Sequence, residues 1–241
     1  ATLLHDDVVD VSSLRRGRQT ANEQWGNAPS VLVGDFLYSR AFQMLVDIAE
    51  MPIMGVMANA TNVISEGEVQ QMANAGNSSL SEEIYRQVIY RKTAKLFEAA
   101  AQVGACLSET DEKAMISYGH HLGMAFQIAD DVLDYKGDPR TIGKNIGDDL
   151  SEGKMTLPLI FARDNSSSSQ AELIRRAISN KSGDNFSDIL DVIRTTGGLE
   201  YSLKQAEEEA NLAKTALVNL PASQYKKVML ELADFSVSRL I

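Results

Sequence analysis

Apolar residues recur at intervals of three and four along almost the entire chain, which is the spacing of one face of an α-helix. No stretch alternates apolar and polar positions between hairpin signals, so strands are not expected. The pattern predicts helices over about residues 29–49, 53–73, 81–104, 111–136, 199–220 and 224–240. The expected fold class is therefore all-α, built from long helices.

Turn-forming residues divide these helices. Ser79 or Ser81 suits the N-cap of the third helix. The serine-rich residues 165–169 are expected to form an exposed loop, and the acidic run 207–209 a solvated helix face. No linker separates the elements, so we expect a single domain over residues 1–241.

Two acidic clusters of the form D-D-x-x-D interrupt the apolar pattern, at residues 6–10 and at residues 130–134. Each helical residue turns about 100°, so the first and last aspartates of a cluster lie near one line. Carboxylates at this spacing repel each other by roughly 0.2–0.5 kcal/mol per pair even when solvated. Mg²⁺ relieves the repulsion, because it accepts one or two carboxylates and completes its shell with water and phosphate oxygens. Two such helices facing each other would hold several cations, and the cations would bind a polyphosphate.

A single acidic helix face in an acidic protein is more often only a solvated surface, because short motifs match by chance. The second copy changes this balance. Gln127, Asp130, Asp131 and Asp134 fall within an arc of about 100°, inside a segment whose other positions carry apolar helical spacing. Solvated faces rarely lie within such apolar segments, so we prefer a metal site.

Basic residues accompany both clusters. Arg15, Arg16 and Arg18 follow the first one, where they either balance charge, which contributes little for an exposed pair, or bind phosphate through the bidentate geometry of arginine. Next to metal-binding carboxylates we prefer phosphate recognition. Lys92 and Thr93 belong either to a polar surface turn or to the same phosphate site.

Residues 141–156 combine glycines with Lys144 and Lys154. Glycines allow a loop to close over a ligand, so a flexible lid with two lysines fits a polyphosphate site. It is not a P-loop, because no strand precedes it and the motif is absent. Elsewhere, Asp35 after Gly34 is as readily a buried hydrogen-bonded group as a site residue.

Composition excludes several classes of protein. The chain has 241 residues, 44% of them hydrophobic, and a net charge of −10, which argues against a nucleic-acid partner because phosphate backbones require clustered Lys and Arg. One cysteine, Cys106, rules out an internal disulfide and disfavours a thiolate zinc site. No signal peptide or membrane-spanning apolar run is evident, so a cytoplasmic protein is the default expectation.

Taken together, the motifs resemble those of the trans-isoprenyl diphosphate synthases, also called polyprenyl synthetases. The segments that carry the resemblance are Asp6–Asp10 with Arg15-Arg16-Gly17, Gly67-Glu68, Lys92-Thr93, Gln127–Asp134 and the stretch from Gly143-Lys144 to Gly153-Lys154. They occur in the family's order along the whole chain. Residues 1–10 and 30–35 resemble most closely the bacterial long-chain members of the octaprenyl type.

The resemblance implies a homodimeric bundle of long antiparallel helices around a central cavity. It implies a transferase that condenses isopentenyl diphosphate with an allylic diphosphate, of the farnesyl diphosphate type, using about three Mg²⁺ ions. The metal ligands implied are Asp6, Asp10, Asp130 and Asp134. The catalytic residues implied are Asp6, Asp7, Asp10, Lys92, Asp130, Asp131 and Lys144. The substrate-binding residues implied are Arg15, Arg16, Lys92, Thr93, Gln127, Lys144 and Lys154, of which Arg16 matches the isopentenyl diphosphate contact.

Product length follows from a steric argument within the resemblance. In the family, aromatic residues four and five positions before the first cluster stop chain growth, whereas here Thr2 and Ala1 are small. We therefore expect a product of hexaprenyl length or longer, with octaprenyl the main expectation, for quinone side chains such as that of ubiquinone. Met44 and Met57 are candidates for the tunnel floor, although a methionine in an apolar stripe is more often plain core. The product would pass to membrane enzymes.

The family also carries an upstream Gly-Lys-x-x-Arg segment and a histidine that bind isopentenyl diphosphate, and this sequence begins after them. We therefore expect the family's N-terminal helices to be missing, and very low activity for a protein that starts at Ala1. Four rival interpretations are a class I terpene cyclase, a non-catalytic partner subunit of a heteromeric synthase, a shorter-chain, geranylgeranyl-type synthase, and a helical metal-binding protein without catalysis, which would not need the lysine-containing lid. A cyclase carries an N-S-E type second motif and more aromatics than the 6% here; a partner subunit usually loses one acidic cluster.

Overall fold

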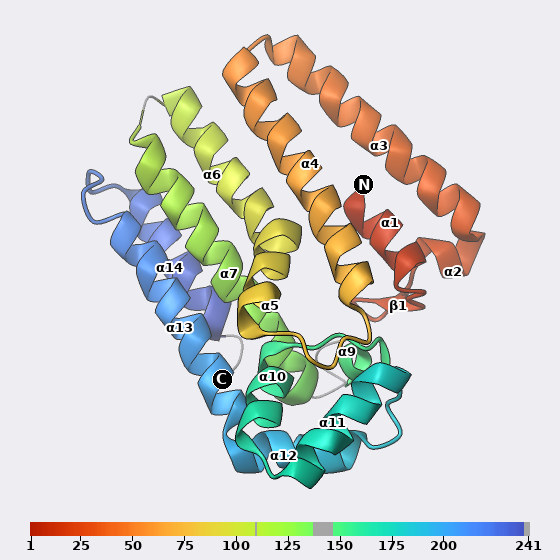
Figure 1. Ribbon diagram of the computed structural model, residues 1–241. Coiled ribbons are helices and arrows are strands. Elements are labelled where there is room, and N and C mark those ends of the chain that lie inside the picture. Colours follow the sequence, from red (N-terminus) through yellow and green to blue (C-terminus); the bar gives the residue numbers. More distant parts are fainter. Residues whose placement is uncertain (109, 137–146, 239–241) are drawn as a thin grey trace. The chain divides into compact units, whose positions relative to one another are not determined.

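The computed structural model describes residues 1–108, 110–136 and 147–238. Helices dominate this part of the chain, which confirms the all-α expectation (Figure 1). They are α1 (Thr2–Val9), α2 (Ala21–Trp25), α3 (Asn27–Ile48), α4 (Met51–Asn74), α5 (Glu82–Ile89), the π-helical turn η1 (Tyr90–Ala94), α6 (Lys95–Ser108), α7 (Glu112–Lys136), α9 (Asp148–Ser151), α10 (Leu157–Asn165), α11 (Ser168–Asn180), α12 (Phe186–Thr196), α13 (Gly198–Ala216) and α14 (Gln224–Ser238). No helix among these described residues is both long enough and apolar enough to cross a bilayer.

The described chain divides into two compact units. The N-terminal unit comprises residues 1–55, and the C-terminal unit comprises residues 56–136 and 147–238. A single domain over residues 1–241 stays a prediction. In the N-terminal unit, α1 and α2 pack on α3, and the Ser30 hydroxyl donates to the Leu4 carbonyl at 2.9 Å.

A short hairpin follows α1, although the apolar pattern predicted no strands. β1 (Leu14–Arg15) pairs with antiparallel β2 (Arg18–Gln19), with Arg15 opposite Arg18. The two connecting residues, Arg16 and Gly17, have φ of 53° and 73°, as a type I′ turn requires. Strands of two residues are too short to show alternation, so the pattern could not reveal them.

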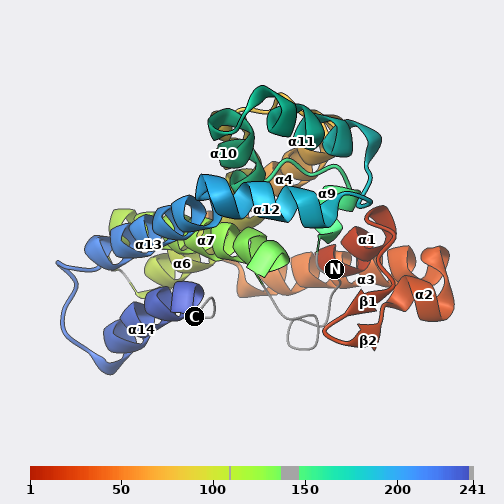
Figure 2. The same cartoon turned by 90° about the horizontal axis from the view of Figure 1, so that it is seen from below.

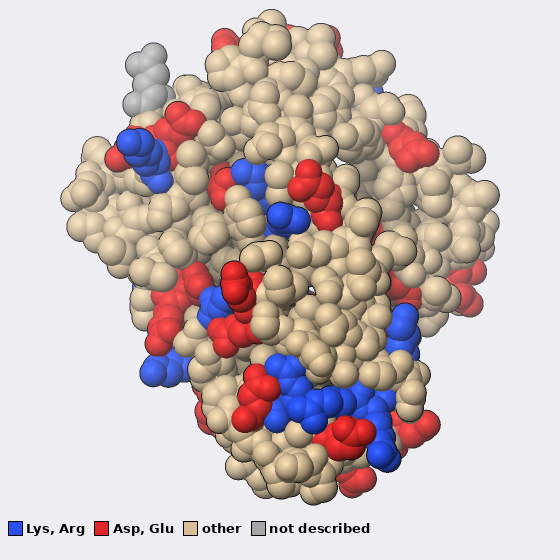
Figure 3. Space-filling view, in the orientation of Figure 1, with Lys and Arg blue, Asp and Glu red and all other residues tan. Residues whose placement is uncertain are grey.

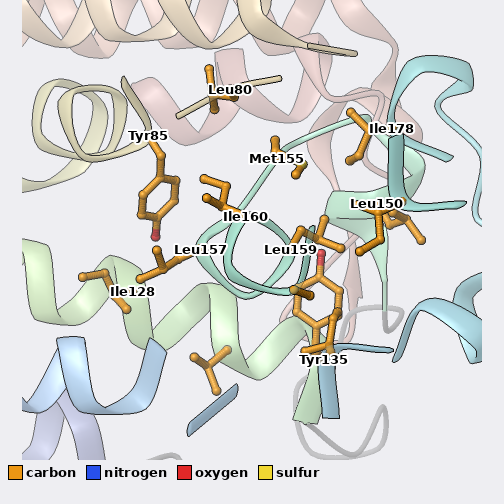
Figure 4. Close-up of a cluster of buried hydrophobic side chains, with 14 of the residues drawn as sticks. Leu80, Tyr85, Ile128, Tyr135, Leu150, Met155, Leu157, Leu159, Ile160 and Ile178 are labelled. Carbon is orange, nitrogen blue, oxygen red and sulfur yellow. The ribbon is translucent and has the colours of Figure 1, made fainter. Parts of the chain in front are cut away.

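Helix α7 lies at the centre of the C-terminal unit and packs against α6 and α13, with α14 beside them (Figures 1 and 2). Its approach to α6 is close, because a Cβ added to Gly119 would lie 2.5 Å from the Phe97 carbonyl oxygen and 2.6 Å from the Glu98 Cα. Below α5, the end of α7 and helices α10 to α12 enclose the main hydrophobic core. Figure 4 shows this core, with Tyr85, Ile128 and Tyr135 among its members.

Three predicted details change in the structure. The helix expected over 81–104 is capped by Ser81, whose hydroxyl accepts from the Ile84 amide at 3.3 Å, but η1 interrupts it with a π-helical turn. The serine stretch 165–169 is not all loop, because Ser167 forms a capping box with Gln170 and starts α11. Glu209 is not solvated as expected, because it accepts hydrogen bonds from Arg86 at 3.0 Å and binds His121 at 2.7 Å.

Candidate active site

The first acidic cluster lies on α1 and continues into its C-cap, Asp10. Asp7 is 3% exposed. Arg15 donates to it from Nε at 2.9 Å and from Nη2 at 2.7 Å, and the hydrogen bond to Asp7 raises the pKa of Arg15. Asp6 and Asp10 are half-buried. Arg15, expected to be committed to phosphate, thus has a carboxylate partner, and its contact with substrate stays a prediction.

His5 also fixes α1 to α3. Its Nε2 lies 3.2 Å from the Val31 carbonyl oxygen and 3.1 Å from Asp35 Oδ1. Gly34 permits this, because a Cβ there would collide with the imidazole. Asp35 is exposed and pairs with His5, so it is not the buried hydrogen-bonded group that one interpretation of the sequence suggested.

The second cluster lies near the C-terminal end of α7, and its middle aspartate is buried. Asp131 is 5% exposed and uses both carboxylate oxygens. The Tyr85 hydroxyl donates to Oδ2 at 2.6 Å, and Gln127 Nε2 donates to Oδ1 at 2.8 Å. Burial, with the charge of Asp149, raises the pKa of Asp131 well above its ordinary value.

Asp134 lies close to other carboxylates, Asp148 and Asp149. Burial and then the charge of Asp149 raise the pKa of Asp134 to about 8, although the Asp149 amide donates to its Oδ2 at 3.3 Å. The pKa values of these carboxyl groups are raised because burial and the repulsion between their negative charges disfavour the ionised forms. A bound cation would offset that repulsion and displace the protons. The charge at this end of α7 therefore suits a hard cation.

The π-helical turn carries the predicted Lys92 and Thr93 to this region of the C-terminal unit. The Thr93 hydroxyl donates to Gln127 Oε1 at 2.8 Å, and Lys92 Nζ donates to Glu68 of α4 at 2.9 Å. Gly67 lies against this turn so closely that a Cβ would be 2.7 Å from the Lys92 amide nitrogen. π-turns occur frequently at functional sites, and this one joins the Lys-Thr pair to the second cluster.

The other predicted residues are more dispersed. Lys154 pairs with Glu152, and its amide donates to the Asp149 carbonyl at 2.8 Å. Lys144 lies outside the described residues. Arg16 is exposed at the hairpin turn, while Ala1, Thr2 and Met44 are exposed and Met57 is half-buried. The chain-length roles of these last four residues stay predictions.

The donor set fits Mg²⁺ in its chemistry. The ligands at hand are carboxylate oxygens, which hard divalent cations prefer. Within residues 1–108, 110–136 and 147–238, no three His, Cys, Asp or Glu side chains form a ready cage for an ion. Mg²⁺ does not require one, because it usually binds one or two carboxylates together with waters and substrate phosphates.

Comparison with known proteins decides the family. The sequence model of the polyprenyl synthetases matches residues 1–194. The chain belongs to the polyprenyl synthetase family. An octaprenyl diphosphate synthase of Haemophilus influenzae is 49% identical, over 99% of this chain and 74% of its own length. An all-trans-nonaprenyl-diphosphate synthase of Rhodobacter capsulatus is 45% identical, over 100% and 74%.

The fold agrees with that membership. The crystal structure of a Caulobacter crescentus polyprenyl synthase, complexed with calcium and isoprenyl diphosphate, superposes with a TM-score of 0.95 at 45% identity. The match covers 100% of this chain and 75% of that one. The family resemblance predicted from the sequence motifs is thereby confirmed.

Two polar residues in contact with predicted site residues had no assigned role from sequence. Glu68 was part of the resemblance, and its contact with Lys92 is new. Tyr85 gave no signal at all, because a tyrosine in an amphipathic helix is typical of core. Only the 2.6 Å contact with Asp131, 46 residues away in sequence, reveals it.

Proposed function

We propose that this chain is a Mg²⁺-dependent trans-prenyltransferase, which adds isopentenyl diphosphate to an allylic diphosphate to make a long all-trans polyprenyl diphosphate. The observation that carries the proposal is the pair of D-D-x-x-D clusters in a member of the polyprenyl synthetase family. In each cluster the second aspartate is buried and held by a hydrogen-bond donor, Arg15 or Tyr85. The resemblance to the family makes the first and last aspartates of each cluster the proposed metal ligands.

The residues have distinct proposed roles. Asp6, Asp10, Asp130 and Asp134 would hold Mg²⁺, about three ions with substrate bound. Bound Mg²⁺ offsets the negative charge that builds on the diphosphate as its bond to the allylic carbon breaks. Arg15, Lys92, Thr93, Gln127, Lys144 and Lys154 would bind the allylic substrate, and Arg16 isopentenyl diphosphate.

The chemistry proposed is electrophilic. The allylic C1–O bond breaks, and its electron pair leaves with the diphosphate. The double bond of isopentenyl diphosphate then attacks C1 through its C4, which leaves a cation at C3. Loss of a proton from C2 to the departed diphosphate then restores a double bond. Lys92 and Arg15 would stabilise the leaving diphosphate through charge-assisted hydrogen bonds. The Thr93 hydroxyl, which donates to Gln127 Oε1 at 2.8 Å, belongs to the same proposed set.

We propose octaprenyl diphosphate as the product, for quinone side chains such as that of ubiquinone. The octaprenyl synthase from Haemophilus is 49% identical, and small residues stand at Ala1 and Thr2. A nonaprenyl synthase, whose product is one isoprene unit longer, is 45% identical, so nonaprenyl diphosphate is the second candidate product. We further propose that the protein acts in the cytoplasm and passes its product to membrane enzymes.

We also propose a homodimer. Helix α3 exposes a run of large apolar side chains that water would solvate poorly: Leu32, Val33, Phe36, Leu37, Tyr38, Met44, Val46 and Ile48. Figure 3 shows that uncharged surface makes up most of this face of the molecule, with charged side chains in separate groups. An exposed apolar patch of this kind is typical of a protein interface.

The experiment that tests the function is incubation of the full-length protein with farnesyl diphosphate, radiolabelled isopentenyl diphosphate and Mg²⁺. Dephosphorylated products are then separated by chromatography. The expected result is a ladder of prenyl alcohols ending at octaprenol. A ladder ending at geranylgeraniol would replace the long-chain proposal by a short-chain one. Absence of any labelled product, with Mg²⁺-dependent diphosphate binding retained, would contradict catalysis and favour a partner subunit.

A further inference from the structure

Tyr85 is a buried polar residue to which the proposed reaction gives no role. It is 3% exposed, and Figure 4 shows its side chain extending from α5 towards α7. Its hydroxyl lies 2.6 Å from Asp131 Oδ2, and Asp131 is itself buried. A short hydrogen bond between two buried groups on different helices holds both side chains in place, because neither has water as an alternative partner.

The other oxygen of Asp131 determines the orientation of the Gln127 amide. Gln127 Nε2 donates to Asp131 Oδ1 at 2.8 Å, and Gln127 Oε1 accepts from the Thr93 hydroxyl at 2.8 Å. A side-chain amide has one donating and one accepting end. With Nε2 fixed on Asp131, Oε1 turns towards Thr93, so a chain of hydrogen bonds runs from α5 through α7 to the π-turn.

We propose that Tyr85 is a positioning residue of the diphosphate site, which holds the Asp131 carboxylate and through it orients Gln127 and Thr93. The inference rests on the proposed function, because that proposal assigns Gln127 and Thr93 to the allylic substrate. Tyr85 touches none of the reacting groups. It acts as outer partners of metal and phosphate ligands commonly do, where removal costs about 10- to 100-fold in affinity or activity.

The test compares two buried tyrosines that each lose one hydroxyl. Tyr85→Phe breaks the contact with Asp131, whereas Tyr118→Phe breaks a 2.9 Å hydrogen bond from α7 to the Met229 carbonyl on α14. Tyr118 lies about three helical turns before the second cluster on α7. Tyr118 is 4% exposed and therefore matches Tyr85 in burial. Circular dichroism and thermal unfolding of both variants control for folding.

Two readouts separate positioning from a general loss of stability. For Tyr85→Phe we expect kcat to fall about 10-fold or more, with an unchanged KM for isopentenyl diphosphate. We also expect a higher Mg²⁺ concentration for half-maximal binding of inorganic diphosphate, measured by calorimetry without turnover. Tyr118→Phe should match the wild-type protein in all three quantities. Wild-type behaviour of Tyr85→Phe, or equal losses in both variants, overturns the proposal.

Asp131→Asn provides a second route to the same answer. An asparagine keeps the shape of the carboxylate but cannot accept from both Tyr85 and Gln127. It should shift the Mg²⁺ dependence of diphosphate binding in the same direction, and Tyr85→Phe should add nothing in that background. A wild-type Mg²⁺ dependence of Asp131→Asn, or an undiminished effect of Tyr85→Phe in it, contradicts the positioning role. If the wild-type protein forms no prenyl product, the proposed function fails, and the binding comparison still decides the role of Tyr85.

Discussion

Single residues show that the D-D-x-x-D pattern contains a structural member. Asp7 and Asp131 are each buried and each accept from a donor within their own unit, Arg15 or Tyr85. A carboxylate removed from water requires such donors, because an unpaired buried charge is costly. In both clusters the second aspartate therefore has a hydrogen-bond donor of its own, although the donor is an arginine in one cluster and a tyrosine in the other.

For Arg15, removal of the guanidinium should lower stability. In Arg15→Gln, Asp7 keeps at most one neutral donor, so we expect the free energy of unfolding to fall by about 2 kcal/mol, measured by urea denaturation. Arg18→Gln is the control, because Arg18 pairs with Arg15 in the hairpin, is exposed, and should change stability by less than about 0.5 kcal/mol. Equal free energies of unfolding for the two variants would show that Arg15 does not stabilise the fold, and would leave phosphate binding as its only proposed role.

Among the elements, α7 is packed closely against α6. Its Gly119 lies against the backbone of Phe97 and Glu98 of α6, so no side chain fits there. At the same contact, the Glu98 carboxylate accepts from Lys95 at 2.5 Å and from Tyr90 at 3.1 Å. Burial alone would raise the pKa of Glu98, but its interactions with His120 and Lys95 outweigh burial and lower it to about 2. Close backbone contact and a charged network thus both fix α7 to α6.

A methyl group at this contact should separate the helices. We expect Gly119→Ala to reduce the free energy of unfolding by about 1–3 kcal/mol, because the added Cβ meets backbone atoms that cannot rotate away. Gly104→Ala in α6 is the matched control, since nothing lies within 4 Å of its added Cβ. There alanine should stabilise the helix by about 0.5–1 kcal/mol. Denaturant titrations that show the same sign for both variants would refute the close-contact argument.

For the whole molecule, the exposed apolar face of α3 predicts self-association. Leu32 and Phe36, 67% and 65% exposed, lie one helical turn apart on this face. We expect Phe36→Asp to raise the dimer dissociation constant by about 10-fold or more, measured by sedimentation velocity. Leu107→Asp, a similarly exposed leucine on α6, should leave association unchanged. A wild-type protein that sediments as a monomer at all concentrations would contradict the homodimer.

Local sequence predicted most of the long helices and the two acidic clusters, and it limited the cap of α5 to Ser79 or Ser81. Helix periodicity, cap preference and motif spacing depend on neighbours a few residues apart, so the pattern contains them. The spacing of Asp6 from Asp10 likewise follows from helix geometry alone. For the same reason the family membership could be predicted, because its motifs are short and lie in a fixed order.

Tertiary structure alone decided which side chains these motifs meet. Arg15 was predicted for phosphate and lies on Asp7, Glu209 was predicted to be solvated and binds Arg86, and Tyr85 was not predicted at all. The hairpin at Arg16-Gly17 and the π-turn at Tyr90–Ala94 also escaped the pattern. The physical reason is that burial and pairing depend on residues brought together from distant parts of the chain. Apolar periodicity indicates which face of a helix is covered, whereas only the folded packing determines which groups cover it.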